Sequence, residues 1–219
     1  MCPGIRALPP VGALWRVLGR RAELDFWRRN PGLVGDGRRE WVFTGCFGVE
    51  RDFYRGKRIL DIGCGPRGSL DWATDAQARI GLDPLAARYV ELAVDTGAMD
   101  YVTGVAERMP FEDASFDVVA TINSLDHVDD IARAAAEIVR VLRPGGLLLI
   151  ATELNHRARL TEPQIFSWEI VDAFSPPFEV LRQTRLADSG AGIDRSLAAA
   201  VPYGGGTGVL VAKLRAPSR

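Results

Sequence analysis

The sequence contains few cysteines and no long apolar run. Only three of its 219 residues are cysteine, Cys2, Cys46 and Cys64, and their spacing matches neither a metal site nor a disulfide framework. We therefore expect reduced thiols, a cytoplasmic location and no bound metal. No apolar stretch approaches the length needed to span a bilayer, so we expect no membrane partner.

Charge of either sign is not in excess. The formal net charge is −1, from 27 basic and 28 acidic residues, and only Lys57 and Lys213 are lysines. Because nucleic-acid-binding domains present a basic surface, this balance argues against a nucleic-acid partner. The chain is 47% hydrophobic and long enough for one domain with a full core.

From residue 57 onward, strand-like and helix-like segments alternate. Strands are expected at residues 57–63, 78–83, 100–106, 116–123 and 146–154. Helices are expected at residues 69–77, 84–95, 129–142 and 161–174. Such alternation implies right-handed crossovers and a parallel sheet, with ligands at the carboxyl ends of the strands.

The last part of the chain follows a different pattern. Two strand-like runs, 178–187 and 206–216, are joined by the long connection 188–206 with no expected helix. This pattern predicts an antiparallel hairpin. The fold class is therefore α/β: a doubly wound, mostly parallel seven-stranded sheet with a C-terminal antiparallel hairpin.

The first 56 residues precede the alternating pattern. Residues 1–22 hold four arginines and no acid, and we expect a mobile N-terminal extension; the alternative is a targeting peptide, for which residues 11–21 could form a short amphipathic helix. Its apolar stretch is too short and too often interrupted by arginine for a signal peptide. Residues 23–56 are expected to form a helical cap segment, and residues 57–219 the α/β domain.

A glycine-rich turn follows the first of these strands. Gly63, Gly65 and Gly68 have the G-x-G-x-x-G spacing that is usually associated with dinucleotides. Asp61, at the end of the strand, suits a cationic ligand group better than a pyrophosphate. Asp83 ends the next strand, where a carboxylate accepts hydrogen bonds from ribose hydroxyls, but ribose is common to both classes of cofactor.

Five motifs between residues 57 and 152 occur in the order of a known family. They are ILDIGCGPRG, GLDP, AERMPFEDASFDVV, NSLDHV and VLRPGGLLLI. Together they resemble the class I S-adenosylmethionine-dependent methyltransferases, in particular the small-molecule branch similar to the ubiquinone/menaquinone (type 11) enzymes. The resemblance implies a Rossmann-like methyltransferase fold and S-adenosylmethionine as the cofactor.

The resemblance also implies roles for individual residues. The implied cofactor-binding residues are Asp61, Gly63 and Gly65 around the methionine part, Asp83 at the ribose, Ala106 and Glu107 at the adenine, and Asn123 near the sulfonium. One position departs from the family pattern. Val105 stands where relatives often carry an Asp or Asn for the adenine amino group, so Glu107 or a water takes this role, or adenine selectivity is weak.

His127 is the candidate catalytic residue. It follows the fourth strand beside the expected methyl group, and it has the chemistry to deprotonate a hydroxyl or an amine. The alternative is a hydrogen bond within its loop. His156 is a weaker candidate on the same edge, and Asp126, Asp129 and Asp130 are expected to cap the following helix.

The expected activity is methyl transfer to a small-molecule acceptor, of a sugar or secondary-metabolite type, by in-line displacement. The fourth strand ends in NSLD rather than in the motif of nucleobase amine methyltransferases, which disfavours those acceptors. Substrate residues are expected within 23–56 and 153–175. The alternatives are a non-catalytic S-adenosylmethionine-binding or regulatory module and, with less support, an NAD(P)-dependent oxidoreductase.

Overall fold

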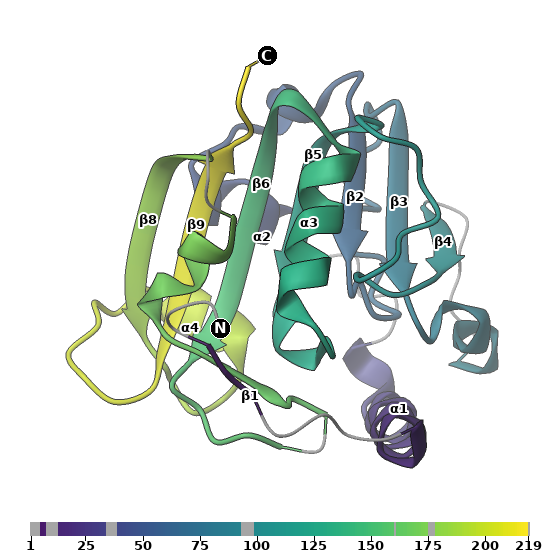
Figure 1. Cartoon of the computed structure of the whole chain (residues 1–219), viewed down its shortest axis with the longest axis vertical. Helices are drawn as coiled ribbons and strands as arrows, with labels where there is room; N and C mark the ends of the chain where they lie inside the picture. Colours follow the sequence, from purple (N-terminus) through teal and green to yellow (C-terminus); the bar gives the residue numbers. More distant parts are fainter. Residues whose placement is uncertain are drawn as a thin grey trace.

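A seven-stranded sheet forms the centre of the molecule. The computed structural model describes residues 5–7, 13–33, 39–92, 99–159, 161–174 and 178–218. The strands lie in the order β4-β3-β2-β5-β6-β9-β8 (Figure 1). Their bounds are β2 (Arg58–Ile62), β3 (Ala78–Asp83), β4 (Asp100–Thr103), β5 (Phe116–Ile122), β6 (Leu142–Leu154), β8 (Glu179–Ala187) and β9 (Gly208–Arg215).

The strand directions confirm the fold class expected from the sequence. The pairs among β2, β3, β4, β5 and β6 are parallel, whereas β9 runs antiparallel to both β6 and β8. The last strand along the chain thus lies between two earlier ones. β6 begins before the expected residue 146, because Leu142 pairs with Phe116 ahead of an irregularity in the register.

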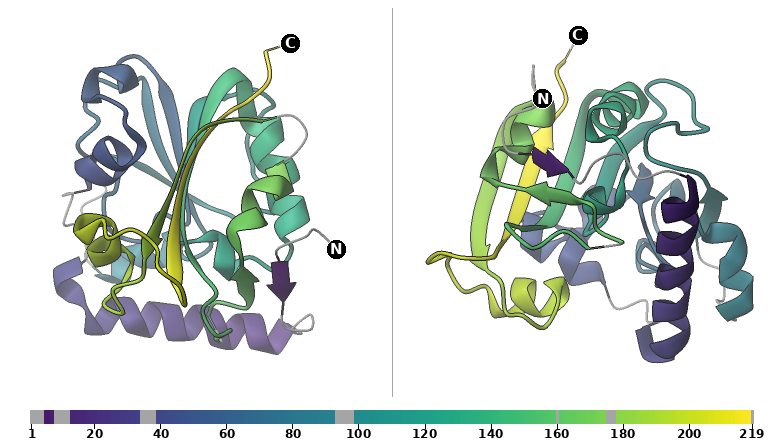
Figure 2. Two further views of the ribbon diagram at one scale, coloured as in Figure 1. Left: turned by 90° about the vertical axis from the view of Figure 1, so that its left-hand side faces the viewer. Right: turned by 60° about the horizontal axis from the view of Figure 1, so that its bottom comes forward.

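Helical segments cover both faces of the sheet (Figure 2, left). One face packs against α3 (Ile131–Val141) and the 3-10 helix η6 (Trp168–Phe174). The other packs against α2 (Glu40–Phe43), α4 (Ile193–Ala199) and the 3-10 helices η2 (Gly45–Phe47) and η3 (Arg51–Tyr54). The strands are therefore buried on both sides, as their apolar sequences require.

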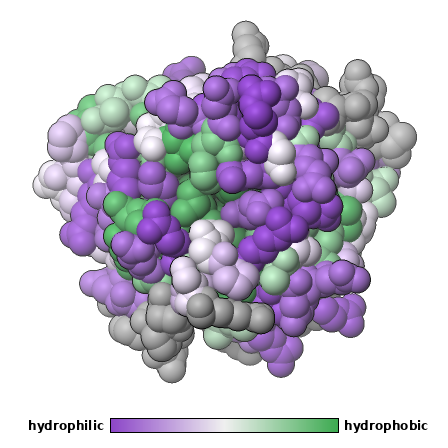
Figure 3. All heavy atoms as spheres, turned by 90° about the horizontal axis from the view of Figure 1, so that it is seen from above, coloured by the Kyte–Doolittle hydropathy of each residue, from purple (hydrophilic) through white to green (hydrophobic). Residues whose placement is uncertain are grey.

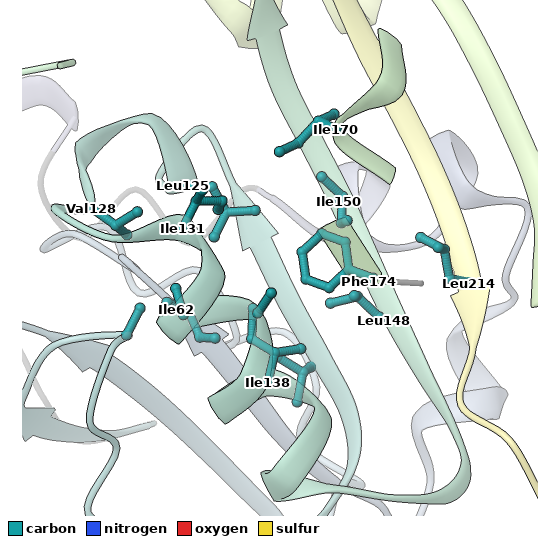
Figure 4. Close-up of a cluster of buried hydrophobic side chains, with 14 of the residues drawn as sticks. Ile62, Leu125, Val128, Ile131, Ile138, Leu148, Ile150, Ile170, Phe174 and Leu214 are labelled. Atoms are coloured by element: carbon teal, nitrogen blue, oxygen red, sulfur yellow. The ribbon is translucent and has the colours of Figure 1, made fainter. Parts of the chain in front are cut away.

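The α3 face shows how the sequence pattern becomes packing. Asp130 is the N-cap, and its carboxylate accepts a hydrogen bond from the Arg133 amide at 3.1 Å, which confirms its expected capping role. The buried residues of α3 recur at helical spacing: Ile131, Ala134, Ala135, Ile138 and Val141. They meet Leu148 and Ile150 of β6, and Phe174 of η6, in one apolar cluster (Figure 4).

Several expected helices are absent or shorter. Residues 69–77 form turns rather than a helix, because the Asp71 and Ala73 amides donate to Gly68 and Leu70 in successive tight turns. Only the 3-10 helix η4 (Ala86–Leu92) occupies the described part of 84–95. The expected helix at 161–174 is the short strand β7 (Gln164–Phe166) followed by η6. Conversely, the connection 188–206 contains α4.

The described part of the N-terminal segment contains one short strand and one long helix. β1 (Ile5–Ala7) pairs antiparallel with β7, and α1 (Ala13–Arg29) crosses the expected boundary at residue 22. The short 3-10 helix η1 (Pro31–Leu33) follows α1. α1 lies across the edge of the sheet where the parallel strands end (Figures 1 and 2). Leu24 anchors it in a small buried cluster with Leu85 and Tyr89, so the helix is part of the packed structure.

The opposite edge of the sheet is the one where the parallel strands begin. Figure 3 shows it from above, with hydrophilic residues surrounding a smaller group of hydrophobic ones. Within the described part of the chain, no helix has both the length and the apolar character to cross a membrane.

Candidate active site

A cavity of about 970 Å³ lies at the carboxyl ends of the parallel strands. Its floor comes from the loops that follow β2, β3, β4 and β5. Residues of α1 line the side of the cavity opposite this floor, which we call the roof. Part of the wall comes from the β6–β7 connection (residues 155–163) and from residues 191–195. This is the position at which open parallel sheets bind their ligands.

The glycine loop uses its amides within the protein. The amides of Gly63, Gly65 and Gly68 donate to the Leu82 carbonyl at 2.7 Å, to Asp83 Oδ2 at 3.1 Å and to the Tyr101 hydroxyl at 3.1 Å. No helix follows the loop, because residues 69–77 are turns. A pyrophosphate site needs free amides at a helix N-terminus, so this geometry argues against a dinucleotide.

α1 is tied to the glycine loop through an aromatic ring. A Cβ atom on Gly65 would lie 2.9 Å from the Trp27 ring, so only glycine allows this close approach. The Arg67 guanidinium lies 5.5 Å from the centroid of the same ring. Asp194 then accepts hydrogen bonds from Arg67 at 3.1 Å and from Arg39 at 2.7 Å. The roof, the loop and α4 are therefore connected.

Asp83 is held firmly at the end of β3. Its two carboxylate oxygens accept from the Gly65 amide at 3.1 Å and from the Leu85 amide at 2.8 Å. Burial raises the pKa of Asp83, and these hydrogen bonds act in the opposite direction. The carboxylate still lines the cavity, and each oxygen keeps a lone pair for a hydroxyl donor.

Asn123 presents an unsatisfied acceptor at the end of β5. Its backbone has a φ of 55°, a left-handed conformation that asparagine tolerates better than most residues. Its side-chain Oδ1 is buried and has no hydrogen-bond partner among the described residues. Because Asn123 lines the cavity, a bound donor would satisfy this oxygen.

Residues 105–107 form the wall beyond β4. Val105, Ala106 and Glu107 all line the cavity. Glu107 Oε1 accepts from the Asp129 amide at 2.7 Å, so this carboxylate also holds the chain that leads into α3. Val105 gives this wall an apolar side chain at the position where relatives often carry an Asp or Asn.

His127 lies in the 3-10 helix η5 (Leu125–His127), which follows β5, and it lines the cavity with a side chain that is 30% exposed. Burial lowers its pKa, but the surrounding negative charges outweigh burial, and the net pKa is raised above its usual value. These charges belong to Asp126, Glu23, Glu162 and Asp83. Glu23 is an α1 residue of the cavity roof, and burial raises its own pKa.

Asp61 is the predicted cofactor residue that the structure places differently. It is 3% exposed, and its side chain lies on the α2 side of the sheet, outside the cavity lining. The Ser69 hydroxyl donates to its Oδ2. Burial raises the pKa of Asp61 to about 6, despite this hydrogen bond and the positive charge of Arg39. Asp61 thus contacts the turn that follows the glycine loop, through Ser69, and not the cavity.

The raised pKa of Asp61 has a measurable consequence. Between pH 4 and 6 the unfolded chain ionises this carboxyl while the folded chain keeps it protonated, so its contribution to stability falls as pH rises. A shift from 3.8 to about 6 corresponds to about 3 kcal/mol, lost above pH 6. Asp61→Asn cannot ionise, so we expect the unfolding free energy of the variant, relative to the parent, to increase between pH 5 and 7.5.

Urea denaturation at several pH values checks this expectation. The matched variant is Ser69→Ala, which removes a hydrogen bond that lowers the pKa of Asp61 and should move the transition to higher pH. A difference between Asp61→Asn and parent that stays constant across the range would show that Asp61 does not titrate there.

The structure brings most of the predicted site residues together. Besides Asp61, the exceptions are His156, which is buried and does not line the cavity, and Asp126, which is fully buried and caps no helix. Three other lining residues are not predicted individually: Glu23 and Arg39, which fall within the expected substrate segment 23–56, and Asp194, which falls outside both expected segments. No local sequence signal marks them, because they reach the cavity only through the packing of α1, α2 and α4.

Comparison with known proteins identifies a related family. Residues 60–150 match the family described as a methyltransferase domain. Phthiotriol/phenolphthiotriol dimycocerosates methyltransferase 1 of Mycobacterium ulcerans (strain Agy99) is 32% identical over 146 residues, 64% of this chain and 52% of that protein. O-methyltransferase rstn1 of Aspergillus nomiae is 39% identical over 105 residues, 44% of this chain and 47% of that protein. The chain spans about half the length of these curated relatives.

Solved structures share the fold. The crystal structure of the (4+2)-cyclase SpnF has a TM-score of 0.68 at 20% identity and covers 99% of both chains. An S-adenosylmethionine-dependent methyltransferase from Mesorhizobium loti has a TM-score of 0.60 at 21% identity, over 82% of this chain and 99% of that one. At these identities the likeness shows the fold alone.

Proposed function

Because the chain belongs to the class I S-adenosylmethionine-dependent methyltransferases of type 11, we propose that it transfers the cofactor's methyl group to a small-molecule acceptor. Family membership makes S-adenosylmethionine the implied cofactor. The observation that supports the proposal best is the arrangement of Gly65, Asp83, Asn123 and His127 around one cavity. The cysteine content supports a reducing, cytoplasmic compartment as part of the same proposal.

The residues of the cavity fit such a cofactor. Asp83 keeps acceptor capacity for ribose hydroxyls, and Gly63 and Gly65 line the cavity beside it, where the methionine part would lie. The unsatisfied Asn123 Oδ1 offers an acceptor near the cationic centre. Ala106 provides an apolar wall for the adenine, and Glu107 the polar group beside it.

Catalysis then rests mainly on positioning. When bound, S-adenosylmethionine supplies an activated methyl group for in-line displacement. His127 accepts the proton of the acceptor hydroxyl as the oxygen becomes a nucleophile. α1, with Trp27 against the glycine loop, covers one side of the cavity.

A hydroxyl is the acceptor group that we propose. Support comes from His127, a base at the position where an alcohol or phenol needs one. Further support comes from the relatives, one of which is named as an O-methyltransferase and another as a phthiotriol dimycocerosates methyltransferase. The acceptor is a sugar or a secondary metabolite in this proposal.

Thermal unfolding with separate ligands tests the cofactor. At about one hundred times its dissociation constant, S-adenosylmethionine or S-adenosylhomocysteine should stabilise the chain by about 2.7 kcal/mol. For a domain of this size the midpoint should rise by about 5 to 10 °C. NADH and NADPH should produce no shift.

The Asp83→Asn variant should lose most of this ligand shift, because the ribose acceptor loses its charge. Asp100→Asn serves as the matched control, since Asp100 is exposed on β4 and lies outside the cavity. A shift with NADH alone would contradict the proposal. A methyl-transfer assay with labelled S-adenosylmethionine against hydroxylated acceptors follows, and binding without transfer would identify a non-catalytic cofactor-binding module instead.

A further inference from the structure

Three side chains beside the cavity have the composition of a metal site. They are Asp126 of η5, and His156 and Glu162 of the β6–β7 connection. One ligand atom from each lies within 4.8 Å of the other two. Glu162 lines the cavity, whereas Asp126 and His156 lie behind its wall.

Asp126 is a buried carboxylate without a hydrogen-bond donor. Its side chain is fully buried, and neither oxygen has a hydrogen-bond partner among the described residues. The facing imidazole nitrogens lie beyond hydrogen-bond distance, at 3.8 Å for His156 Nε2 and 3.9 Å for His127 Nε2. Burying a carboxylate without hydrogen-bond donors is costly, so a cation bound to both oxygens and a facing nitrogen would stabilise this arrangement.

His156 faces Asp126 with a nitrogen that is also unpartnered. Its Nδ1 lies 3.0 Å from the Arg157 carbonyl oxygen, which only accepts hydrogen bonds, so Nδ1 carries a proton. In the neutral ring Nε2 therefore has a lone pair. This nitrogen is buried, has no partner in the described part of the chain and points toward Asp126. Two acceptors thus face each other across 3.8 Å.

We propose that Asp126, His156 and Glu162 bind a divalent transition metal ion, Zn²⁺ or Mn²⁺. Zinc lies about 2.0–2.1 Å from imidazole nitrogen and about 2.0–2.2 Å from carboxylate oxygen. An ion bonded to both groups spans at most about 4.3 Å, which accommodates the observed 3.8 Å with the ion off the line between the two atoms. Two carboxylates with one imidazole suit either metal.

The surroundings support a ligand role. The hydrogen bond from His156 Nδ1 to the Arg157 carbonyl is the outer contact that orients a metal-binding imidazole. Glu162 also accepts a hydrogen bond from the Arg159 guanidinium at 3.0 Å. This cation already neutralises part of the carboxylate charge, so Glu162 is the weakest of the three ligands. The ion joins η5 to the β6–β7 connection next to His127, and three protein ligands leave a coordination position for water.

Metal binding is measured on the untagged full chain without cofactor or acceptor, so its outcome is independent of the methyl-transfer proposal. The chain is stripped with chelator, dialysed against Zn²⁺ or Mn²⁺, and its metal content is determined by mass spectrometry. We expect one ion per chain, a higher unfolding midpoint with the metal, and a visible absorption band from Co²⁺ bound at the same site.

Substitutions assign the ligands. Because loss of an outer partner alone costs about 10- to 100-fold in affinity, Asp126→Asn and His156→Gln should each weaken binding by about 100-fold or more. Glu162→Gln should cost less. Glu112→Gln makes the same change at an exposed carboxylate outside the cluster and should bind like the parent.

Circular dichroism establishes that each variant is folded. If the change at the fully buried Asp126 prevents folding, His156→Gln and Glu162→Gln carry the test. Less than one-tenth of an ion per parent chain would overturn the proposal. Binding that the ligand substitutions leave unchanged would overturn it equally, by placing the ion elsewhere.

Discussion

Alanine in place of His127 is expected to lower kcat for a hydroxyl acceptor by about 10²- to 10⁴-fold, the usual contribution of a positioned general base. The side chain lines the cavity beside Asn123 and contributes to no buried core. The thermal shift with S-adenosylhomocysteine should therefore remain close to that of the parent. Steady-state kinetics with labelled cofactor measures the effect.

Chemical rescue separates a base from a merely structural histidine. Imidazole added to His127→Ala should restore part of the lost rate and leave the parent unaffected, because a free base can enter the space that the side chain vacates. A variant within threefold of the parent rate would remove His127 from the reaction. The loop hydrogen-bond alternative would then stand.

The Gly63→Ala substitution is expected to reduce stability by about 3 kcal/mol and to abolish cofactor binding. A Cβ atom here would lie 2.3 Å from Ser124 Cβ, so the chain after β5 must move. The left-handed backbone, with φ of 67°, adds its own cost. The unfolding midpoint should fall by about 10 °C, and the ligand shift should vanish because Ser124 adjoins Asn123.

Gly56→Ala is the matched control. Gly56 has nearly the same φ, 69°, but a Cβ there meets no atom within 4 Å. It should lose only the backbone contribution of about 1 to 2 kcal/mol and retain the full ligand shift. Equal losses in the two variants would show that steric contact with Ser124 has no part in the effect.

The strands and the floor of the cavity could be predicted from the sequence because local patterns encode them. Buried strands are largely apolar runs; Gly63 and Asn123 each follow one directly, and Asp83 ends one. Parallel topology then brings the strand ends to one edge. Asp61 shows the limit of this reasoning, since alternation along β2 turns its side chain to the α2 face.

The missing helix at 69–77 and the roof of the cavity have different causes. In the first case, Trp72 Nε1 donates to the Ser69 carbonyl and its ring packs against Tyr54, so tertiary contacts favour turns over a helix. In the second, Glu23 reaches the cavity through a helix whose position depends on distant residues. No local pattern reports such a placement.

The position of β9 has a consequence for how the chain reaches its structure. Until β9, the later segment, inserts between them, the edges of β6 and β8 that face it are unpaired, and β8 has no other partner strand in the described part of the sheet. The pairing of β6 with β9 brings Leu154 beside Gly208. The entropy cost of closing the long loop between them arises before any hydrogen bond of the pair can compensate for it. Folding should thus be slowed by this last insertion, with two open strand edges prone to aggregation meanwhile. A chaperone that covers these edges would raise the yield of native protein more than one that acts on the parallel half.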